Sequence, residues 1–217
     1  MIYQLPKDEI SFPDPRKCQG EDDGLLAIGG DLSVDRLILA YSNGIFPWYP
    51  FRSDLIQWYC PMQRFVIFTN EIHVSHSMRT LFNSGVYYCT INTSFAEVIA
   101  NCGKVAQRNE HQLAWLGDNI IEAYTKLHEL GYAMSVETRR TADNELIGGL
   151  YGVAIGSCFC GESMFSFEPN GSKYALISLA NLMSRSGLQI IDCQFETPHL
   201  RSMGGRHISY DEYMKYL

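Results

Sequence analysis

The sequence predicts an α+β fold, with a small N-terminal domain over residues 1–62 and a larger domain over residues 63–217. Three apolar segments in close succession in the second part are typical of antiparallel strands. An amphipathic segment at 172–186 and a further apolar segment at 188–195 follow them. The order of three strands, helix and strand predicts a mostly antiparallel sheet with packed helices and one crossover helix.

The first part of the chain contains few periodic segments. Residues 11–31 are rich in Pro, Gly and Asp, which predicts turns. A short helix is expected over 33–42, because Ser33 can cap its start and its apolar residues share one face. The run Gly44-Ile-Phe-Pro-Trp-Tyr-Pro50 predicts an aromatic turn closed by two prolines. Strands are expected over 55–59 and 64–69.

The second part contains clearer signals. Ser94 and Glu97 form a capping box that predicts the start of a short helix, each side chain satisfying the backbone amide of the other. A longer amphipathic helix is expected from Asp118, and its core-facing positions are Ile120, Ala123, Tyr124, Leu127 and Leu130. The remaining expected elements are a helix at 75–83, a strand at 86–91, and strands at 132–137, 145–155 and 157–165.

Composition limits the possible functions. The net charge is −7 over 217 residues, so overall charge would not attract a nucleic acid, and any RNA contact must use a local patch or stacking. The N-terminus does not resemble a signal peptide, and no segment approaches the roughly 20 apolar residues of a membrane span. With seven cysteines and no Cys-x-x-Cys pair, we expect reduced thiols and a cytoplasmic location.

Metal and cofactor motifs are weak. Cys158 and Cys160 face one side of an expected strand, but the sequence shows no second ligand pair beside them. His73 and His76 have the spacing of helical metal ligands and lack a carboxylate partner. Glycine-rich phosphate and dinucleotide fingerprints are missing from the sequence. We therefore predict neither a metal site nor a cofactor.

Three polar residues in apolar segments are candidates for chemistry. Glu162 interrupts an otherwise apolar strand, where a carboxylate is costly unless it is paired or wet. Asp192 and Gln194 are two apart in the expected strand 188–195, so their side chains are predicted to share one face. If Glu162 shares that face, the three groups converge in a pocket. The alternatives are a solvent-facing Glu162 and a buried hydrogen-bonded pair with no catalytic role.

Trp48 and Trp115 are the aromatic candidates. Indole rings stack on nucleobases, but single tryptophans more often belong to a core or a rim.

Several strings together resemble the leucyl/phenylalanyl-tRNA–protein transferase family. They are Gly24-Leu-Leu-Ala-Ile-Gly-Gly-Asp-Leu-Ser33, Gly44-Ile-Phe-Pro-Trp48, Gly148-Gly-Leu-Tyr-Gly-Val-Ala-Ile-Gly156, Cys160-Gly-Glu-Ser-Met-Phe-Ser166 and Ile191-Asp-Cys-Gln194. The resemblance implies that the larger domain has an acetyltransferase-like (GNAT-related) fold. It also implies transfer of Leu or Phe from aminoacyl-tRNA to proteins that begin with Arg or Lys. The product would carry an N-terminal degradation signal for the ClpS/ClpAP pathway. We expect weaker discrimination against Met and a monomeric protein.

The resemblance also implies roles for individual residues. Gln194 matches the family's reaction-centre glutamine, and Glu162 matches its pocket glutamate. Asp192 matches the supporting aspartate, which would fix the Gln194 side-chain amide. Trp48 and Trp115 match the tryptophans that hold the terminal adenosine of the tRNA. The pocket for the Leu or Phe side chain matches Leu150, Phe159, Leu176, Leu179 and Ile191.

The basic surface departs from the family pattern. The family usually has a basic cluster on the helix near 76–84, where this chain keeps only Arg79 as a fully charged residue. We therefore predict weak tRNA binding with a shallow salt dependence. The arginines that could compensate are Arg64, Arg108, Arg139, Arg140 and Arg201.

Two other functions are compatible with the residues considered alone. An acyl-CoA N-acyltransferase of related fold would need amides that hold a pyrophosphate at a helix start, and the stretch 167–172 is a poor match. A non-catalytic RNA-binding or adaptor protein would not need Glu162, Asp192 and Gln194.

Overall fold

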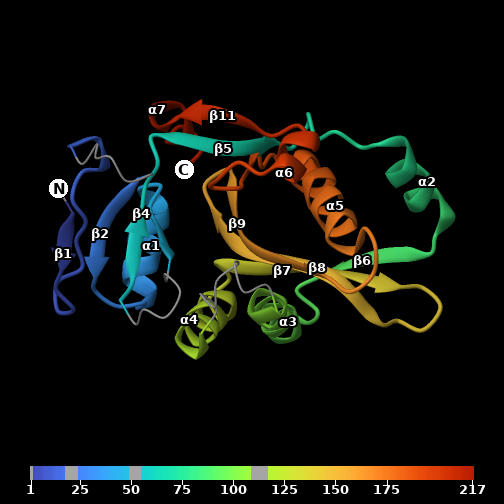
Figure 1. Ribbon diagram of the computed structural model, residues 1–217, viewed down its shortest axis with the longest axis horizontal. Helices are drawn as coiled ribbons and strands as arrows, with labels where there is room; N and C mark the ends of the chain where they lie inside the picture. The colour runs from blue at the N-terminus through green and yellow to red at the C-terminus, as the bar shows by residue number, and fades with distance from the viewer. Residues whose placement is uncertain (1, 18–23, 49–54, 109–116) are drawn as a thin grey trace.

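Two β-sheets with helices packed against them make up the computed structural model, which describes residues 2–17, 24–48, 55–108 and 117–217 (Figure 1). The predicted α+β class is confirmed. The strands of the first sheet lie within residues 3–59 and those of the second within residues 63–209. One buried cluster nevertheless includes Leu37 and Trp58 from the first part together with Tyr124 and Phe165 from the second. The division at residue 62 stays a prediction.

The first sheet has four strands in the order β1 (Tyr3–Leu5), β2 (Leu25–Gly29), β4 (Gln57–Tyr59) and β3 (Phe46–Trp48). The helix predicted at 33–42 is present as α1 (Val34–Ser42), and a 3-10 turn covers Pro15–Lys17. Two expectations were wrong. The turn-rich stretch 11–31 contains β2, and the aromatic turn contains β3. Both segments become strands because β4 pairs with each of them, a partner that local pattern does not reveal.

The second sheet has seven strands in the order β11-β5-β10-β9-β8-β7-β6. The bounds are Arg206–Ser209, Gln63–Phe68, Ile190–Asp192, Cys158–Ser166, Leu146–Ile155, Ala133–Arg140 and Tyr87–Ile91, in that order. Its described neighbours pair antiparallel except β9 and β10, which are parallel. Helix α5 (Gly171–Ser186) makes the crossover between these two strands, as predicted. Strand β10 is much shorter than the expected 188–195.

Helices α3 (Phe95–Arg108) and α4 (Asp118–Glu129) cover one face of this sheet, and α5 covers the other (Figure 1). The remaining helices are α2 (His76–Ser84), α6 (Pro198–Ser202) and α7 (Tyr210–Tyr213). Leu127 of α4 is buried as expected, whereas Leu130 is 60% exposed, because the helix ends at Glu129.

Helix α3 starts in a different way from the predicted capping box. The amide of Ser94 donates to Oε1 of Glu137, at 3.3 Å, from strand β7. Glu137 is fully buried and also accepts hydrogen bonds from Ser135 and Thr90, at 2.6 and 2.7 Å. Burial raises the pKa of Glu137, but these hydrogen bonds outweigh it and hold the pKa below its usual value. A buried carboxylate distant in sequence thus replaces Glu97 at the Ser94 amide.

Within the described ranges, no helix combines the length and the apolar character that crossing a membrane requires.

Candidate functional site

Glu162 sits at an irregular point of strand β9. The register with β8 shifts between Tyr151 and Gly152, which pair with Ser163 and Gly161, so Glu162 is the extra residue of a bulge. Bulges turn a side chain away from the regular alternation and are common beside active sites. Glu162 is thereby directed toward Tyr41 of α1 and Tyr124 of α4.

Two buried tyrosines hold the Glu162 carboxylate. Tyr41 of α1 donates to Oε1 at 2.7 Å, and Tyr124 of α4 donates to Oε2 at 3.2 Å. The two hydroxyls also contact each other. Burial raises the pKa of Glu162 to about 7, and the tyrosine hydrogen bonds oppose this rise only in part. A carboxylate between the two parts of the chain therefore titrates near neutral pH.

Asp192 ends strand β10 and is 2% exposed. Its Oδ2 lies 3.5 Å from Nη1 of Arg64 and accepts a hydrogen bond from Tyr213 at 2.8 Å. Arg64 is 1% exposed and also donates to the carbonyl of Gly44, in the first part of the chain. Burial lowers the pKa of Arg64, but the attraction of Asp192 more than compensates and raises it above its usual value. The pair is a buried, charged connection between the two parts of the chain.

Gln194 follows β10 in a left-handed backbone conformation, with φ of 57°. The strand ends at Asp192, so the expectation that Asp192 and Gln194 share a strand face was wrong. Oδ1 of Asp192 accepts the backbone amide of Gln194 at 2.8 Å. The predicted contact was to the side-chain amide. The carboxylate therefore holds the turn that carries Gln194, and only indirectly its side chain.

A pocket of about 150 Å³ lies where these elements meet, lined by Phe46, Pro47, Trp48, Glu162, Gln194 and Phe195. The Trp48 ring lies 5.2 Å from the ring of Phe195 and 5.6 Å from that of Tyr59, which places it in an aromatic group at the pocket wall. Three predicted site residues, Trp48, Glu162 and Gln194, thus line one cavity. Trp115 lies outside the described residues.

The five residues predicted to bind the aminoacyl side chain lie elsewhere. They are between 0 and 3% exposed and belong to one buried cluster on the α5 side of the sheet: Leu150, Phe159, Leu176, Leu179 and Ile191. None of them is among the residues that line the pocket beside Glu162. The structure brings these five together, but it does not join them to Trp48, Glu162 and Gln194 in one open cavity.

Most of the described arginines proposed as compensating phosphate contacts are already paired. Arg64 is buried against Asp192, Arg139 donates to Ser94 at 2.6 Å, and Arg201 pairs with Glu196. The side chain of Arg108 lies outside the described part of the chain. Arg79 is exposed on α2, and its Nε donates to the carbonyl of Val74 at 3.1 Å.

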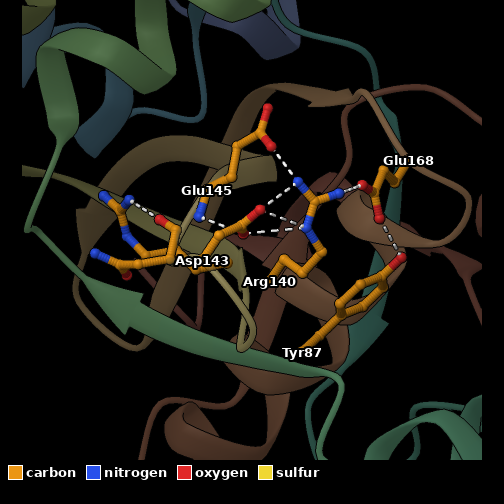
Figure 2. Close-up of polar contacts among 7 residues, drawn as sticks. Tyr87, Arg140, Asp143, Glu145 and Glu168 are labelled. Atoms are coloured by element: carbon orange, nitrogen blue, oxygen red, sulfur yellow. Dashed lines mark hydrogen bonds and ion pairs between the residues drawn. The ribbon is translucent and has the colours of Figure 1, made fainter.

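Arg140 is the most heavily paired of them, as Figure 2 shows. It contacts Asp143, at 2.8 Å, and also Glu145 and Glu168. Glu168 in turn accepts a hydrogen bond from Tyr87 at 2.8 Å. Three carboxylates around one guanidinium give this group a net negative charge, which disfavours a phosphate.

Sequence reasoning missed the partners that position the polar groups: Tyr41, Tyr124, Arg64 and Tyr213. The available signal was weak. Tyr41 and Tyr124 fall on the core faces of their helices, and a buried tyrosine hydroxyl needs a hydrogen-bond partner. Nothing in the sequence indicated that Tyr41 and Tyr124 share Glu162 as their hydrogen-bond partner.

The start of α5 does not offer a pyrophosphate site. The amide of Gly171 donates to the carbonyl of Glu168 at 3.1 Å, and that of Ser172 donates to Oγ of Ser166 at 3.2 Å. A Cβ at Gly148 would come within 2.6 Å of the Gly171 carbonyl carbon, so strand β8 closes against this turn. Amides that are satisfied internally count against the acyl-CoA alternative.

An aromatic pocket with one carboxylate and one amide, and with no Ser, Cys or Lys among its described lining residues, suits an enzyme that positions an already activated substrate. The model of the family described as leucyl/phenylalanyl-tRNA protein transferase matches residues 66–217, and the model of its N-terminal domain matches residues 30–62. The chain belongs to this family of enzymes.

Relatives named leucyl/phenylalanyl-tRNA–protein transferase cover nearly the whole chain. The protein of Flavobacterium psychrophilum is 48% identical over 209 residues, 96% of both chains. The protein of Idiomarina loihiensis is 45% identical over 217 residues, 100% of this chain and 90% of its own. A protein from Escherichia coli is 42% identical over 216 residues, 100% of this chain and 89% of its own.

Solved structures overlap less well. A protein of unknown function from Bacteroides thetaiotaomicron has a TM-score of 0.47 at 11% identity and covers 81% of this chain and 62% of its own. A GNAT-family acetyltransferase from Staphylococcus aureus has a TM-score of 0.37 at 13% identity and covers 48% of this chain and 71% of its own. With TM-scores below 0.5, these overlaps support no inference about function.

Proposed function

We propose that this enzyme transfers Leu or Phe, and Met less well, from aminoacyl-tRNA to the N-terminal Arg or Lys of proteins. The observation that carries the proposal is the pocket lined by Trp48, Glu162 and Gln194, from three separate elements of a chain in this family. The product would be a degradation signal for the ClpS/ClpAP pathway. We further propose a cytoplasmic monomer with domains at 1–62 and 63–217.

The terminal adenosine of the tRNA is proposed to stack on Trp48. Its ring is half-buried and supported by Phe195 and Tyr59, so it offers a rigid aromatic wall. Base stacking of this kind contributes about 1–3 kcal/mol and does not depend on base identity. Trp115 is proposed as the second stacking partner on the strength of the family resemblance alone.

The reaction needs positioning more than activation. The acceptor α-amine attacks the ester carbonyl, a C–N bond forms, the ester C–O bond breaks, and the amine proton passes to the departing 3′ or 2′ oxygen of the tRNA. The ordinary pKa of an α-amine is near 8, so roughly a tenth of it is the neutral, nucleophilic form at neutral pH. The carbonyl oxygen of the Gln194 side chain is proposed to accept a hydrogen bond from this amine. Asp192 holds the Gln194 backbone and thereby fixes the position of the turn from which the side-chain amide extends.

Glu162 is proposed to attract the cationic acceptor. Arg64 balances the charge of Asp192, whereas the described partners of Glu162 are two neutral tyrosines. An ionised Glu162 therefore presents a net negative charge to the pocket, where it favours an ammonium group.

The apolar cluster on the α5 side is proposed to select the donor side chain. Strands β9 and β10 pair only over Cys158–Cys160 and Ile190–Asp192, and beyond them the chain turns away at Gln194. A side chain that enters there would approach Phe159 and Ile191. An apolar site of this kind rejects polar residues through desolvation, while one methylene changes binding by only about 1–3 kcal/mol. Discrimination against Met and Ile is therefore expected to be weak.

Arg79 is proposed to contact the tRNA backbone. Arg64, Arg140 and Arg201 are paired with carboxylates, and Arg139 is hydrogen-bonded to Ser94, so few phosphates would be neutralised. A shallow dependence of tRNA affinity on salt follows. A steep slope, equivalent to many phosphate contacts, would contradict this part of the proposal.

The proposal is tested by donor and acceptor choice in a transfer assay with the full chain. Labelled leucyl-, phenylalanyl-, methionyl- and seryl-tRNA are each supplied with peptides that differ only in an N-terminal Arg, Lys or Ala. Transfer of Leu and Phe to the Arg and Lys peptides, less of Met, and none of Ser is expected. Equal transfer to the Ala peptide would overturn the acceptor assignment, and transfer of Ser would overturn the apolar donor pocket.

A further inference from the structure

Asp192 also belongs to a compact group of potential metal ligands that includes two cysteines of β9. Cys158 and Cys160 are adjacent on one face of β9, and β10 places Asp192 opposite Cys160 in the parallel register. The two sulfurs and a carboxylate oxygen of Asp192 all lie within 4.8 Å of one another, and the three residues are no more than 2% exposed. The sequence concealed this third ligand, because Asp192 is far from the two cysteines along the chain.

We propose that Cys158, Cys160 and Asp192 form a binding site for a soft divalent cation of the Zn²⁺ or Cd²⁺ class. This site shares Asp192 with the transfer site proposed above, but the proposal does not depend on the transfer reaction.

The distances suit such a cation. The two sulfurs are 3.9 Å apart. Tetrahedral Zn²⁺ with Zn–S bonds of about 2.3 Å requires a sulfur–sulfur separation of about 3.8 Å. The hydroxyl of Tyr213 lies 3.8 Å from Cys158 Sγ and 3.6 Å from Cys160 Sγ, at the fourth corner of the group. The ligands therefore have nearly the required separations before any cation is bound.

The same distances disfavour a disulfide as the purpose of the pair. Two residues apart in a strand, with a rise of 3.2–3.4 Å per residue, the Cα atoms are separated by roughly 6.6 Å. That value is at the upper limit of disulfide geometry. The spacing of the two cysteines therefore favours coordination of one cation by both sulfurs over a direct disulfide bond.

Charge balance permits a cation in this buried place. Without a cation, the two cysteines are free thiols, and the negative charge of Asp192 is matched by Arg64. When a divalent cation binds, two metal–sulfur bonds form and two thiol protons leave for solvent. The two thiolates then match the two positive charges, and Arg64 still matches Asp192. The group is neutral in both states, so the cost of burying an unbalanced charge does not arise.

Cation binding would leave the Gln194 turn in place. Only Oδ2 of Asp192 faces the Tyr213 side of the group, while Oδ1 accepts the Gln194 amide. A cation would replace the hydrogen bond from Tyr213 to Oδ2 and keep the other. Because both thiols and Tyr213 are no more than 1% exposed, entry requires local opening at α7 and is expected to be slow.

The test uses Cd²⁺, whose bonds to thiolates absorb in the near ultraviolet in proportion to the number of thiolates. Reduced full-length protein is unfolded and refolded with Cd²⁺, with Zn²⁺, or with Mg²⁺ as a hard-cation control. After removal of free ions, we expect one bound Cd²⁺ or Zn²⁺ per chain, the absorption of two thiolates per Cd²⁺, and no bound Mg²⁺. Cys89→Ser, a half-buried thiol on β6, is the matched control and should keep the bound cation.

Cys158→Ser and Cys160→Ser should each lose the cation and the two-thiolate absorption, with folding checked by circular dichroism. If either variant fails to fold, the stoichiometry and absorption of the wild-type protein decide the question. Wild-type protein that refolds without retaining Cd²⁺ or Zn²⁺ overturns the proposal, as does retention in both folded serine variants.

Discussion

Substitution of Asp192 by Asn probes the buried charge pair that holds the Gln194 turn. The change keeps the shape of the side chain and an oxygen that can accept the Gln194 amide, but it removes the negative charge beside Arg64. Arg64 then remains 1% exposed with no carboxylate partner. Two of its nitrogens, Nε and Nη1, already lack a hydrogen-bond partner among the described residues.

The magnitude follows from this isolation. Removing one member of a buried ion pair costs about 3–5 kcal/mol, because the other charge stays buried and uncompensated. For a chain of this size each kcal/mol shifts the midpoint of thermal unfolding by about 2–4 °C, so the expected fall is roughly 6–20 °C. Replacing both partners, as in Arg64→Met with Asp192→Asn, removes the isolated charge. It should return the midpoint close to that of the wild type.

Differential scanning calorimetry of the two single variants and the double variant measures the coupling directly. Asp143→Asn is the matched control, because its arginine partner, Arg140, is 29% exposed and keeps two other carboxylate partners (Figure 2). A shift for Asp192→Asn as small as that for Asp143→Asn would refute the reasoning. So would a double variant whose loss equals the sum of the single losses.

Three further predictions concern other parts of the chain. The pKa of Glu137 is lower in the folded protein than its unfolded value of about 4.5, so its ionised form stabilises the fold above that pH. This stabilisation is lost as the pH falls further. The melting temperature of Glu137→Gln should therefore depend less on pH between 3 and 6 than that of the wild type. Gly148→Ala places a methyl group against the backbone of α5 and should cost about 1–3 kcal/mol in urea unfolding. Gly117→Ala should cost far less, because a Cβ there meets none of the described residues within 4 Å. Arg140→Ala should lower the melting temperature only slightly, and the difference should shrink in high salt; an unchanged difference would argue against an electrostatic origin.

Regular periodicity made the larger part of the fold predictable. The apolar spacing that defines α4 and α5 and the three successive strands β7, β8 and β9 give a local signal, and each element forms where that signal is strong. The parallel pairing of β9 and β10 agrees with the predicted crossover helix. Because α5 returns the chain to the end of the sheet where β9 began, β10 runs in the same direction as β9. Short elements were missed where a distant strand provides the pairing, as β4 does for β2 and β3.

The site was predictable as a set of residues and not as a geometry. Glu162 and Gln194 stood out because polar side chains in apolar segments are costly. The strand pattern could not reveal that Gln194 adopts a positive φ, since the contact that supports this turn is made by Asp192. Nor could it show that the tyrosines that hold Glu162 come from α1 and α4, 121 and 38 residues away.

We propose that transfer occurs in the pocket lined by Trp48, Glu162 and Gln194. The most direct test is single-turnover transfer of leucine to a peptide that begins with Arg. Wild type, Glu162→Gln and Gln194→Ala are compared, with Glu196→Gln, an exposed carboxylate nearby in the sequence, as the matched control. We expect at least a tenfold slower transfer in the two pocket variants, with unchanged melting temperatures, and a wild-type rate in the control. Wild-type rates in both folded pocket variants would contradict the assignment of this pocket.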